Sequence, residues 1–382
     1  MVMKNILVSL FFLLAACSNR TGGGVYVDLK EKSIISVLDM TDSIRVVQLE
    51  TNEQCLLGQI EKVLFYKGTY YILDYGQQNV LCFDQNGIFL RKISDRGRGP
   101  HEYELIGDIS IDPYSDQLLL SVPFGSVLSF DTNGNFTTRV DIADAGAINE
   151  LFVLDPDRWL IISLYDYQIL YFSKKENTIV ERLYKGDVSE YPVAPLYRTY
   201  TYKDSVFFAP MFGNKTLNMT DHGRRLAYSW DFGTMNNRQK QIESFITDLK
   251  FLEARPFAPG ERKYDKALAL INHNLNFFIR YTREFSRYRM AVMDYNNDKI
   301  HVMYDKQEQK ALVFSKTKEG LYWTKPVFLY NQDMIIAYDC TIEGIPYVSY
   351  AKEILSLTQR QIVETFNPIT DNPFLVVYYL KK

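Results

Sequence analysis

The segment 96–103, Arg-Gly-Arg-Gly-Pro-His-Glu-Tyr, is the densest group of polar side chains whose types and spacing suit binding chemistry. In an extended loop, arginines two positions apart lie on one side, where they can hold a carboxylate, sulfate or phosphate. A nearby tyrosine ring can stack on a sugar. In the alternative interpretation, the glycines and the proline only shape a tight turn, and the glutamate pairs with an arginine. The candidate ligand contacts are Arg96, Arg98, His101, Glu102 and Tyr103.

Other patterns that support catalysis or metal binding are missing from the sequence. The four histidines are scattered, and neither His-x-x-x-His nor Cys-x-x-Cys spacing occurs. There is no Gly-x-Ser-x-Gly elbow, phosphate loop or dinucleotide fingerprint. We therefore expect no metal, no cofactor and no chemistry by the protein alone. A carboxylate pair for glycoside hydrolysis, assembled only by folding, is the alternative that stays open.

The N-terminus carries a signal for export and lipid attachment. Lys4 precedes the apolar run 6–14, which is far shorter than the roughly 20 residues of a membrane-spanning helix and suits the core of a signal peptide. The run ends in Leu-Ala-Ala-Cys, where small residues fit a signal peptidase and the thiol accepts diacylglycerol. We expect a signal peptide over 1–16, a lipid on Cys17 and a flexible tether over 17–24. An ordinary signal peptide with an incidental cysteine is the alternative.

Composition narrows the class of protein. The net charge of −3 argues against nucleic-acid binding. Aromatic residues make up 14% of the chain and Gly, Asn and Asp turns recur, which favours β-structure. With Cys17 lipidated, an odd number of cysteines remains, so buried free thiols are expected rather than a disulfide framework. After Cys17 no stretch is long and apolar enough to span a membrane.

A repeated strand pattern indicates the fold. Residues 70–90 alternate between apolar runs and turns, and Asn86-Gly87 between two such runs is the strongest short hairpin signal. The pattern returns with Asn133-Gly134, 47 residues later, and fainter copies lie at 169–172 and 221–223. Units of four short strands with a period of about 40–50 residues are typical of propeller blades. The sequence therefore predicts an all-β propeller.

One segment departs from the strand pattern. Apolar residues in 236–254 recur at helical spacing, Pro256 ends that helix, and a second short helix follows. We expect 236–272 to be a helical insertion that packs on the propeller, with a lid over the channel as the alternative. The apolar runs 44–49 and 372–380 near the two ends are expected to share one blade, which closes the ring and hides both edges.

Four short stretches carry a family resemblance. They are Gln-Leu-Glu-Thr at 48–51, Tyr-Ile-Leu-Asp at 71–74, the loop 97–103 and Asp-Asn-Pro at 371–373. Together they resemble the six-bladed β-propeller lipoproteins of Bacteroidota, which are distantly similar to NHL-repeat propellers. The family usually has glycine where this chain has His101, which bears on any binding role of the loop. The resemblance covers most of the chain after Cys17 and implies a six-bladed propeller over 25–382 in the cell envelope, but no activity.

Two classes of function stay open. The first is a non-catalytic binding or scaffold module of the envelope, which holds a glycan, a peptide or a partner protein on a propeller face. The second is an envelope enzyme that acts on glycans through a carboxylate pair at the channel mouth. The scarcity of catalytic motifs favours the first. The acidic residues that often follow the lipidated cysteine in surface-exported relatives are absent. We therefore expect the protein on the outer membrane facing the periplasm, with surface exposure as the alternative.

Overall fold

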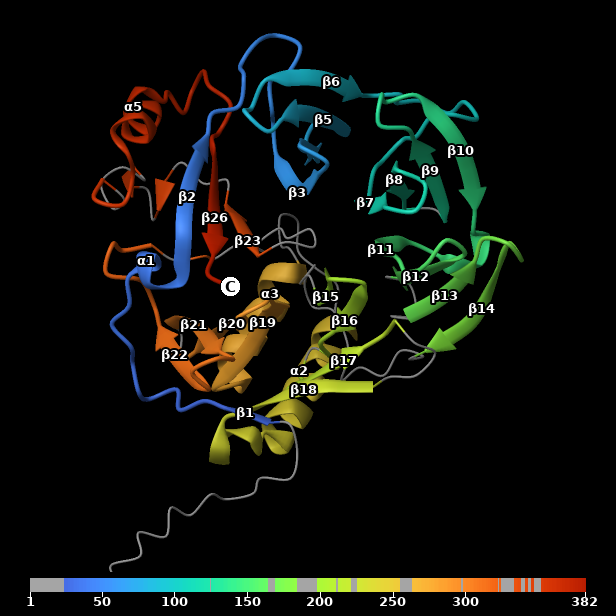
Figure 1. Ribbon diagram of the computed structural model, residues 1–382. Coiled ribbons are helices and arrows are strands. Elements are labelled where there is room, and N and C mark those ends of the chain that lie inside the picture. The colour runs from blue at the N-terminus through green and yellow to red at the C-terminus, as the bar shows by residue number, and fades with distance from the viewer. Residues whose placement is uncertain are drawn as a thin grey trace, which may run out of the picture.

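The computed structural model is a ring of six β-sheets around a central axis (Figure 1). Each sheet is one blade of a β-propeller, so the predicted all-β, six-bladed fold is confirmed. The signal peptide, Cys17, the tether up to residue 23 and the faint repeat at 221–223 lie outside the described residues, so the predictions made for them stay predictions. The structure describes residues 24–123, 125–163, 169–183, 198–210, 212–220, 225–254, 263–296, 298–321, 323, 333–337, 341–342, 345–346 and 352–382.

Four blades are antiparallel sheets of four strands that follow one another along the chain, with the first strand nearest the axis (Figure 1). Blade 1 contains β3 (Ile60–Tyr66), β4 (Thr69–Asp74), β5 (Asn79–Asp84) and β6 (Phe89–Ile93). Blade 2 contains β7 (Asp108–Asp112), β8 (Gln117–Val122), β9 (Ser126–Phe130) and β10 (Phe136–Asp141). Blade 3 contains β11 (Ile148–Val153), β12 (Arg158–Ser163), β13 (Ile169–Ser173) and β14 (Thr178–Leu183). Blade 5 contains β19 (Phe277–Glu284), β20 (Tyr288–Tyr295), β21 (Asp298–Asp305) and β22 (Lys310–Phe314).

The strand sequences explain this arrangement. The middle strands are apolar on both faces, because each blade is covered by a neighbour on either side; β9 and β13, for example, are buried at every position. The rim strands are more exposed, and β14 alternates between exposed and half-buried positions over its whole length. Apolar side chains of adjacent blades therefore form the core in successive layers between the sheets.

The Asn-Gly turns of blades 1 and 2 are tight turns before the rim strand, as the repeat predicts. In each, an aspartate at the end of the third strand accepts hydrogen bonds from the turn: Asp84 from Asn86 N–H at 2.8 Å, and Asp131 from Asn133 N–H at 2.8 Å. Gly87 and Gly134 have φ of +88° and +86°, a conformation that favours glycine. The 47-residue repeat is thus a repeat of blades.

Blade 6 closes the ring with strands from both ends of the chain, as expected. It contains β23 (Met334–Ala337), the C-terminal β26 (Leu375–Leu380) and β2 (Thr41–Val47), and β2 pairs antiparallel with β26. The Asn372 side chain fastens this closure: its amide donates to Glu50 O at 2.7 Å and to Cys55 O at 2.8 Å. Its carbonyl accepts from Leu57 N–H at 2.8 Å.

Blade 4 receives a fifth strand from the N-terminus. Its own strands are β15 (Thr199–Tyr202), β16 (Ser205–Phe208), β17 (Lys215–Asn218) and β18 (Arg225–Asp231). The strand β1 (Gly24–Tyr26) pairs in parallel with β18 at the rim. Ser33 N–H then donates to Val313 O in β22 at 2.6 Å, before the chain enters β2 in blade 6. The segment that follows the tether therefore runs along the outside of blade 5 and links blades 4 and 6 (Figure 1).

The helical insertion is present between blades 4 and 5. It consists of α2 (Gln239–Ala254) and α3 (Lys263–Asn274). The predicted apolar stripe faces inward: Phe245 and Leu249 are fully buried against Phe212 and Phe278, which belong to the neighbouring blades. The insertion thus packs on the propeller.

Smaller elements complete the chain. The helix α1 (Val37–Met40) and the helix α5 (Leu357–Thr365) are each preceded by a serine that forms a capping box. The hairpin β24 (Thr341–Ile342) and β25 (Ile345–Pro346) precedes α5. Short 3-10 helices span Ala143–Ala145 and Gly233–Asn236. Among the described residues, no helix is long and apolar enough to cross a membrane.

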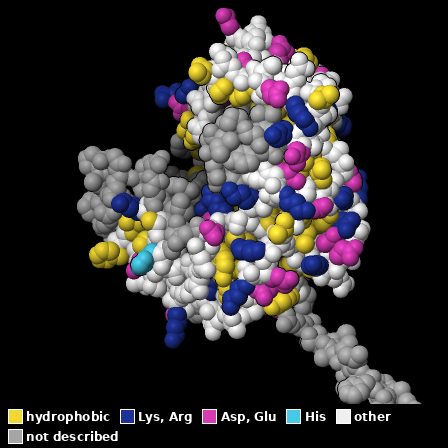
Figure 2. Space-filling model, turned by 90° about the vertical axis from the view of Figure 1, so that its left-hand side faces the viewer, with side chains coloured by type: hydrophobic (Ala, Val, Ile, Leu, Met, Phe, Trp, Pro, Cys, Tyr) yellow, Lys and Arg dark blue, Asp and Glu magenta, His cyan; other side chains and the backbone are white. Residues whose placement is uncertain are grey.

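The visible surface carries a mixture of charges. On the face in Figure 2, acidic and basic side chains are interspersed, with apolar side chains scattered among them. No broad region of one sign is visible on that face.

Candidate functional site

The loop predicted to bind a ligand joins β6 to β7 and is folded onto itself. Arg96 and Tyr103 form an isolated bridge, with Gly97 N–H donating to Tyr103 O at 3.0 Å. Tyr103 is 1% exposed and donates its hydroxyl to Ile93 O at 3.2 Å. Its ring belongs to the core between blades 1 and 2, so the expectation that it could stack on a sugar does not fit this structure.

The charged residues of the loop are exposed and paired locally. Arg98 forms an ion pair with Glu104, and the Arg98 side chain is 87% exposed. Glu102 accepts a hydrogen bond from Gly99 N–H at 2.7 Å. His101 stacks on Phe136, the first residue of the rim strand β10, with ring centroids 4.1 Å apart. The middle of the loop therefore lies over the rim and not near the channel; its ligand-binding role stays a prediction.

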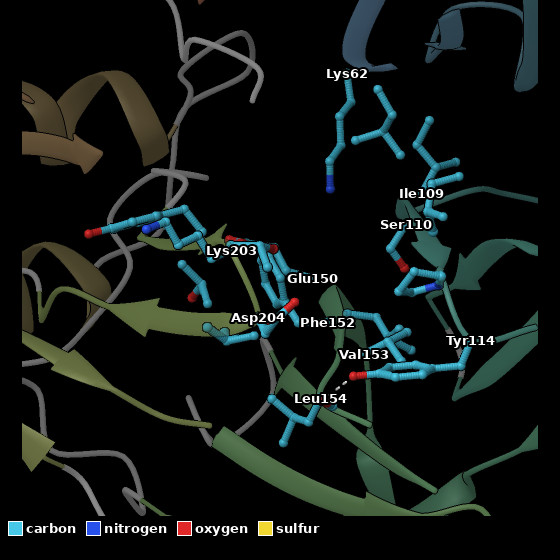
Figure 3. Close-up of a pocket in the computed structure, with 18 of the residues that line it drawn as sticks. Lys62, Ile109, Ser110, Tyr114, Glu150, Phe152, Val153, Leu154, Lys203 and Asp204 are labelled. Atoms are coloured by element: carbon cyan, nitrogen blue, oxygen red, sulfur yellow. Dashed lines mark hydrogen bonds between the residues drawn. The ribbon is translucent and has the colours of Figure 1, made fainter. Parts of the chain in front are cut away.

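The structure instead brings polar residues together at the axis. A cavity of about 230 Å³ lies between the innermost strands β3, β7, β11 and β15, and Arg283 of β19 also reaches it. We call it the channel cavity. Figure 3 shows Lys62 extending into the space around which Ser110, Glu150 and Tyr114 are arranged. Its polar lining residues are Lys62, Ser110, Tyr114, Glu150, Thr199, Thr201, Lys203, Asp204 and Arg283.

A buried ion pair links blades 1 and 2 beside the channel cavity. Lys62 Nζ lies 2.6 Å from Asp108 Oδ1, and the two side chains are 12% and 4% exposed. Burial raises the pKa of Asp108, and Lys62 opposes that rise. The second oxygen of Asp108 accepts from Leu151 N–H in blade 3 at 3.2 Å. This carboxylate thereby connects three blades.

Glu150 lies in β11 and is buried among these charges. It is 4% exposed, and burial together with the nearby Asp108 raises its pKa to about 8. The cations Lys62, Arg283 and Arg198 oppose that rise. At neutral pH the Glu150 carboxyl group is therefore mostly protonated and can donate a hydrogen bond.

Two buried arginines face this cluster from blades 4 and 5. Burial and the neighbouring Arg280 lower the pKa of Arg198 to about 9. The Arg283 guanidinium is 5.4 Å from the ring centroid of Tyr200 and 5.2 Å from that of Tyr281. Cations over aromatic faces are stabilised electrostatically, more strongly where water is excluded. Blades 1 to 5 therefore each contribute a polar or charged side chain at the axis.

The mouth of the channel cavity is marked by exposed side chains. Tyr114 is 53% exposed and donates its hydroxyl to Leu154 O at 3.2 Å. Lys203 and Asp204, in the turn between β15 and β16, are exposed as well. The described residues contain no group of three or more His, Cys, Asp or Glu that could hold a metal ion.

Sequence reasoning missed the channel cavity. Lys62, Asp108 and Glu150 are more than 40 residues apart in succession and follow no catalytic or metal-binding spacing. The available signal is weak: charged residues occur within the inner strands, as Glu150 does directly before the buried Leu151. Because such residues meet only when the ring closes, no local sequence motif predicts the cavity.

Comparison with known proteins supports the fold. A protein of Bacteroides fragilis described as a candidate exported protein is 15% identical, with a TM-score of 0.72 over 94% of this chain and 99% of that chain. A member of the DUF4221 family from Bacteroides vulgatus is 12% identical, with a TM-score of 0.48 over 89% of this chain and 99% of that chain. No curated protein matches the sequence.

The family is defined by sequence as well as by fold. The model of the family described as Domain of unknown function (DUF4934) matches residues 25–379, which is nearly the whole chain after the tether. This match and the ring of six blades confirm the family resemblance expected from the motifs. The chain belongs to the DUF4934 family, and it folds as a six-bladed β-propeller.

Proposed function

We propose that this protein is a non-catalytic binding module of the bacterial cell envelope, and that its ligand binds in the channel cavity. The carrying observation is that Lys62, Ser110, Glu150, Thr199 and Arg283, from five different blades, line one buried volume. Burying polar and charged groups lowers the stability of the fold unless they are fully paired. Groups with strongly perturbed protonation in a cavity are therefore more common at functional sites than elsewhere.

The proposed location is the outer membrane, on the periplasmic side. The lipobox Leu-Ala-Ala-Cys supports a lipid on Cys17, and a short tether then leads to β1 at the rim of blade 4. A glycan, a peptide or an envelope protein that reaches the propeller from the periplasm is the proposed kind of partner. The membrane itself is contacted through the lipid.

A thermal-shift screen tests the binding function. Oligosaccharides, peptidoglycan fragments and short peptides are added to the protein, since a ligand of the folded state raises its melting temperature. Two variants then locate the site: Ser110→Leu fills the channel cavity, and Arg98→Ala removes the central cation of the 96–103 loop. We expect the shift to disappear in Ser110→Leu and to persist in Arg98→Ala. The opposite result would place the site in the loop.

A second candidate function is hydrolysis of glycans. One observation favours it: Asp108 is ion-paired to Lys62, while Glu150 nearby has a pKa of about 8, and glycosidases use two carboxyl groups in different protonation states. Against it, Asp108 is 3% exposed and does not line the channel cavity. If the purified protein hydrolyses an oligosaccharide and Glu150→Gln abolishes this activity, the result would support glycan hydrolysis as the function.

A further inference from the structure

Two hydroxyl groups in the channel cavity have no hydrogen-bond partner among the described residues. Ser110 Oγ is on β7 and Thr199 Oγ1 is on β15, and the two residues are 8% and 3% exposed. A buried hydroxyl without a partner lowers the stability of the fold. Both residues line the channel cavity, and their hydroxyl oxygens are themselves buried, so one ligand with hydroxyl or carbonyl groups can satisfy both once the two side chains rotate toward it.

The charges around the same space favour a negative ligand. The cations Lys62, Arg198 and Arg283 and the carboxylate Asp108 act on Glu150, and Lys203 and Asp204 at the mouth add one charge of each sign. Since Glu150 is mostly protonated at neutral pH, cationic charge exceeds anionic charge in this cluster. In a buried site such an excess attracts an anion more strongly than it does in water.

Size and lining restrict the ligand further. The channel cavity, at about 230 Å³, is small and suits a molecule of the size of a single sugar ring. Apolar side chains between the polar groups can contact its carbon skeleton, and the exposed ring of Tyr114 at the mouth can stack on it. The apolar lining residues include Leu64, Ile111, Phe152, Val153 and Val206.

We propose that the channel cavity binds a small hydroxylated carboxylate of the sugar-acid class, with the carboxylate toward Lys62 and Arg283 and the hydroxyls toward Ser110 and Thr199. This inference rests on the proposed binding function and specifies its ligand. The protonated Glu150 then donates to a ligand oxygen instead of repelling it. No covalent step is involved.

Isothermal titration calorimetry of the full chain tests the ligand class. The probes are D-glucuronate and D-galacturonate, and D-glucose and D-galactose are the neutral controls that differ from them at one carbon. We expect both acids to bind and both neutral sugars to bind at least about tenfold more weakly, because a charge-assisted hydrogen bond contributes about 1.5–3 kcal/mol.

Variants that separate binding from folding complete the test. Ser110→Ala and Thr199→Val are each expected to weaken uronate binding by about tenfold, while the melting temperature stays the same or rises, because an unsatisfied buried hydroxyl is removed. Ser121→Ala is the matched control: Ser121 Oγ is also buried and without a partner among the described residues, but it lies outside the channel cavity. It should leave binding unchanged.

Each outcome decides between the two proposals. Neutral sugars that bind as tightly as the acids, with binding lost in Ser110→Ala, would overturn the acidic ligand class but leave the channel cavity as the binding site. Uronate binding that persists in both cavity variants would overturn the placement. No uronate binding at millimolar concentration would overturn the inference, while the binding function is judged separately by the thermal-shift screen.

Discussion

Gly87→Ala, compared with Gly134→Ala, tests how blade 1 is held against the closing blade. Both glycines occupy the same place in their blades and have nearly the same φ, +88° and +86°. Alanine in this conformation costs about 1 kcal/mol at either site. The smaller entropy of the unfolded alanine chain acts equally on both variants and therefore cancels in the comparison.

The two sites differ in what a new methyl group would meet. At Gly87 it would overlap the backbone carbonyl oxygen of Gln48 and lie 2.9 Å from the carbonyl carbon. At Gly134 it would lie 3.2 Å from Cδ of Arg91, a flexible side chain that can move away. Gly87 O also accepts from Glu50 N–H at 2.8 Å, which fixes the backbone segments together. Overpacking of a rigid contact costs about 1–3 kcal/mol more, so we expect total losses of about 1 kcal/mol for Gly134→Ala and 2–4 kcal/mol for Gly87→Ala.

Urea unfolding followed by the fluorescence of the buried tryptophans measures the difference. With a slope of about 3 kcal/mol/M, an additional loss of 2 kcal/mol lowers the unfolding midpoint by about 0.7 M. Equal midpoints for the two variants would refute the reasoning, because they would mean that the strand segment after β2 yields to the methyl group without loss of stability.

Four further predictions concern other parts of the molecule. Burial lowers the pKa of His301 to about 4, whereas its pKa in the unfolded chain is about 6.5. The folded protein is therefore fully stable with respect to this group above pH 6.5 and loses up to about 3 kcal/mol as the pH falls toward 4. In urea unfolding at several pH values, His301→Phe should lose less stability than the parent between pH 6.5 and 4. The pH dependence of stability due to Glu150 has the opposite direction, because its pKa in the folded protein is raised to about 8. The stability is full below about pH 4.5 and falls as the pH rises through 8. Thermal unfolding at pH 9 should therefore show that Glu150→Gln is more stable than the parent. Asn372→Ala should lower the free energy of unfolding by about 2–4 kcal/mol in the same urea assay, since it removes three hydrogen bonds and leaves Cys55 O and Leu57 N–H without the partner that Asn372 supplies, while Glu50 O keeps only the Cys55 thiol; an unchanged midpoint would contradict this. Cys17→Ala should move the protein from the membrane fraction to the soluble fraction, and continued membrane association would count against lipidation.

Features whose cause is local could be predicted from the sequence. The turns at Asn86-Gly87 and Asn133-Gly134 depend on positive φ and on an aspartate two residues before the asparagine. They are therefore determined by a few neighbouring residues. The stripe of α2 depends on helical periodicity alone, and it is buried as expected. The apolar terminal runs predicted a shared blade because an unpaired edge is unfavourable, and β2 and β26 do pair.

Features that depend on contacts between blades could not be predicted in this way. The 96–103 loop shows polar types at close spacing, but burial is a tertiary property, and only the packing of blade 1 on blade 2 takes Tyr103 out of the solvent. The partner of Arg98 is Glu104, six residues on, which the sequence permits but does not select over Glu102.

The channel cavity is the clearest case of what tertiary structure alone decides. The sequence determines the short strands, their turns and the blade period, because hydrogen bonding and side-chain alternation act over a few residues. It does not reveal that Lys62, Asp108, Glu150 and Arg283 meet, since each lies in a strand of a different blade and three of these strands carry other charged residues as well. Only closure of the ring brings the first strands to one axis, and only there does the exclusion of water alter the protonation of Glu150.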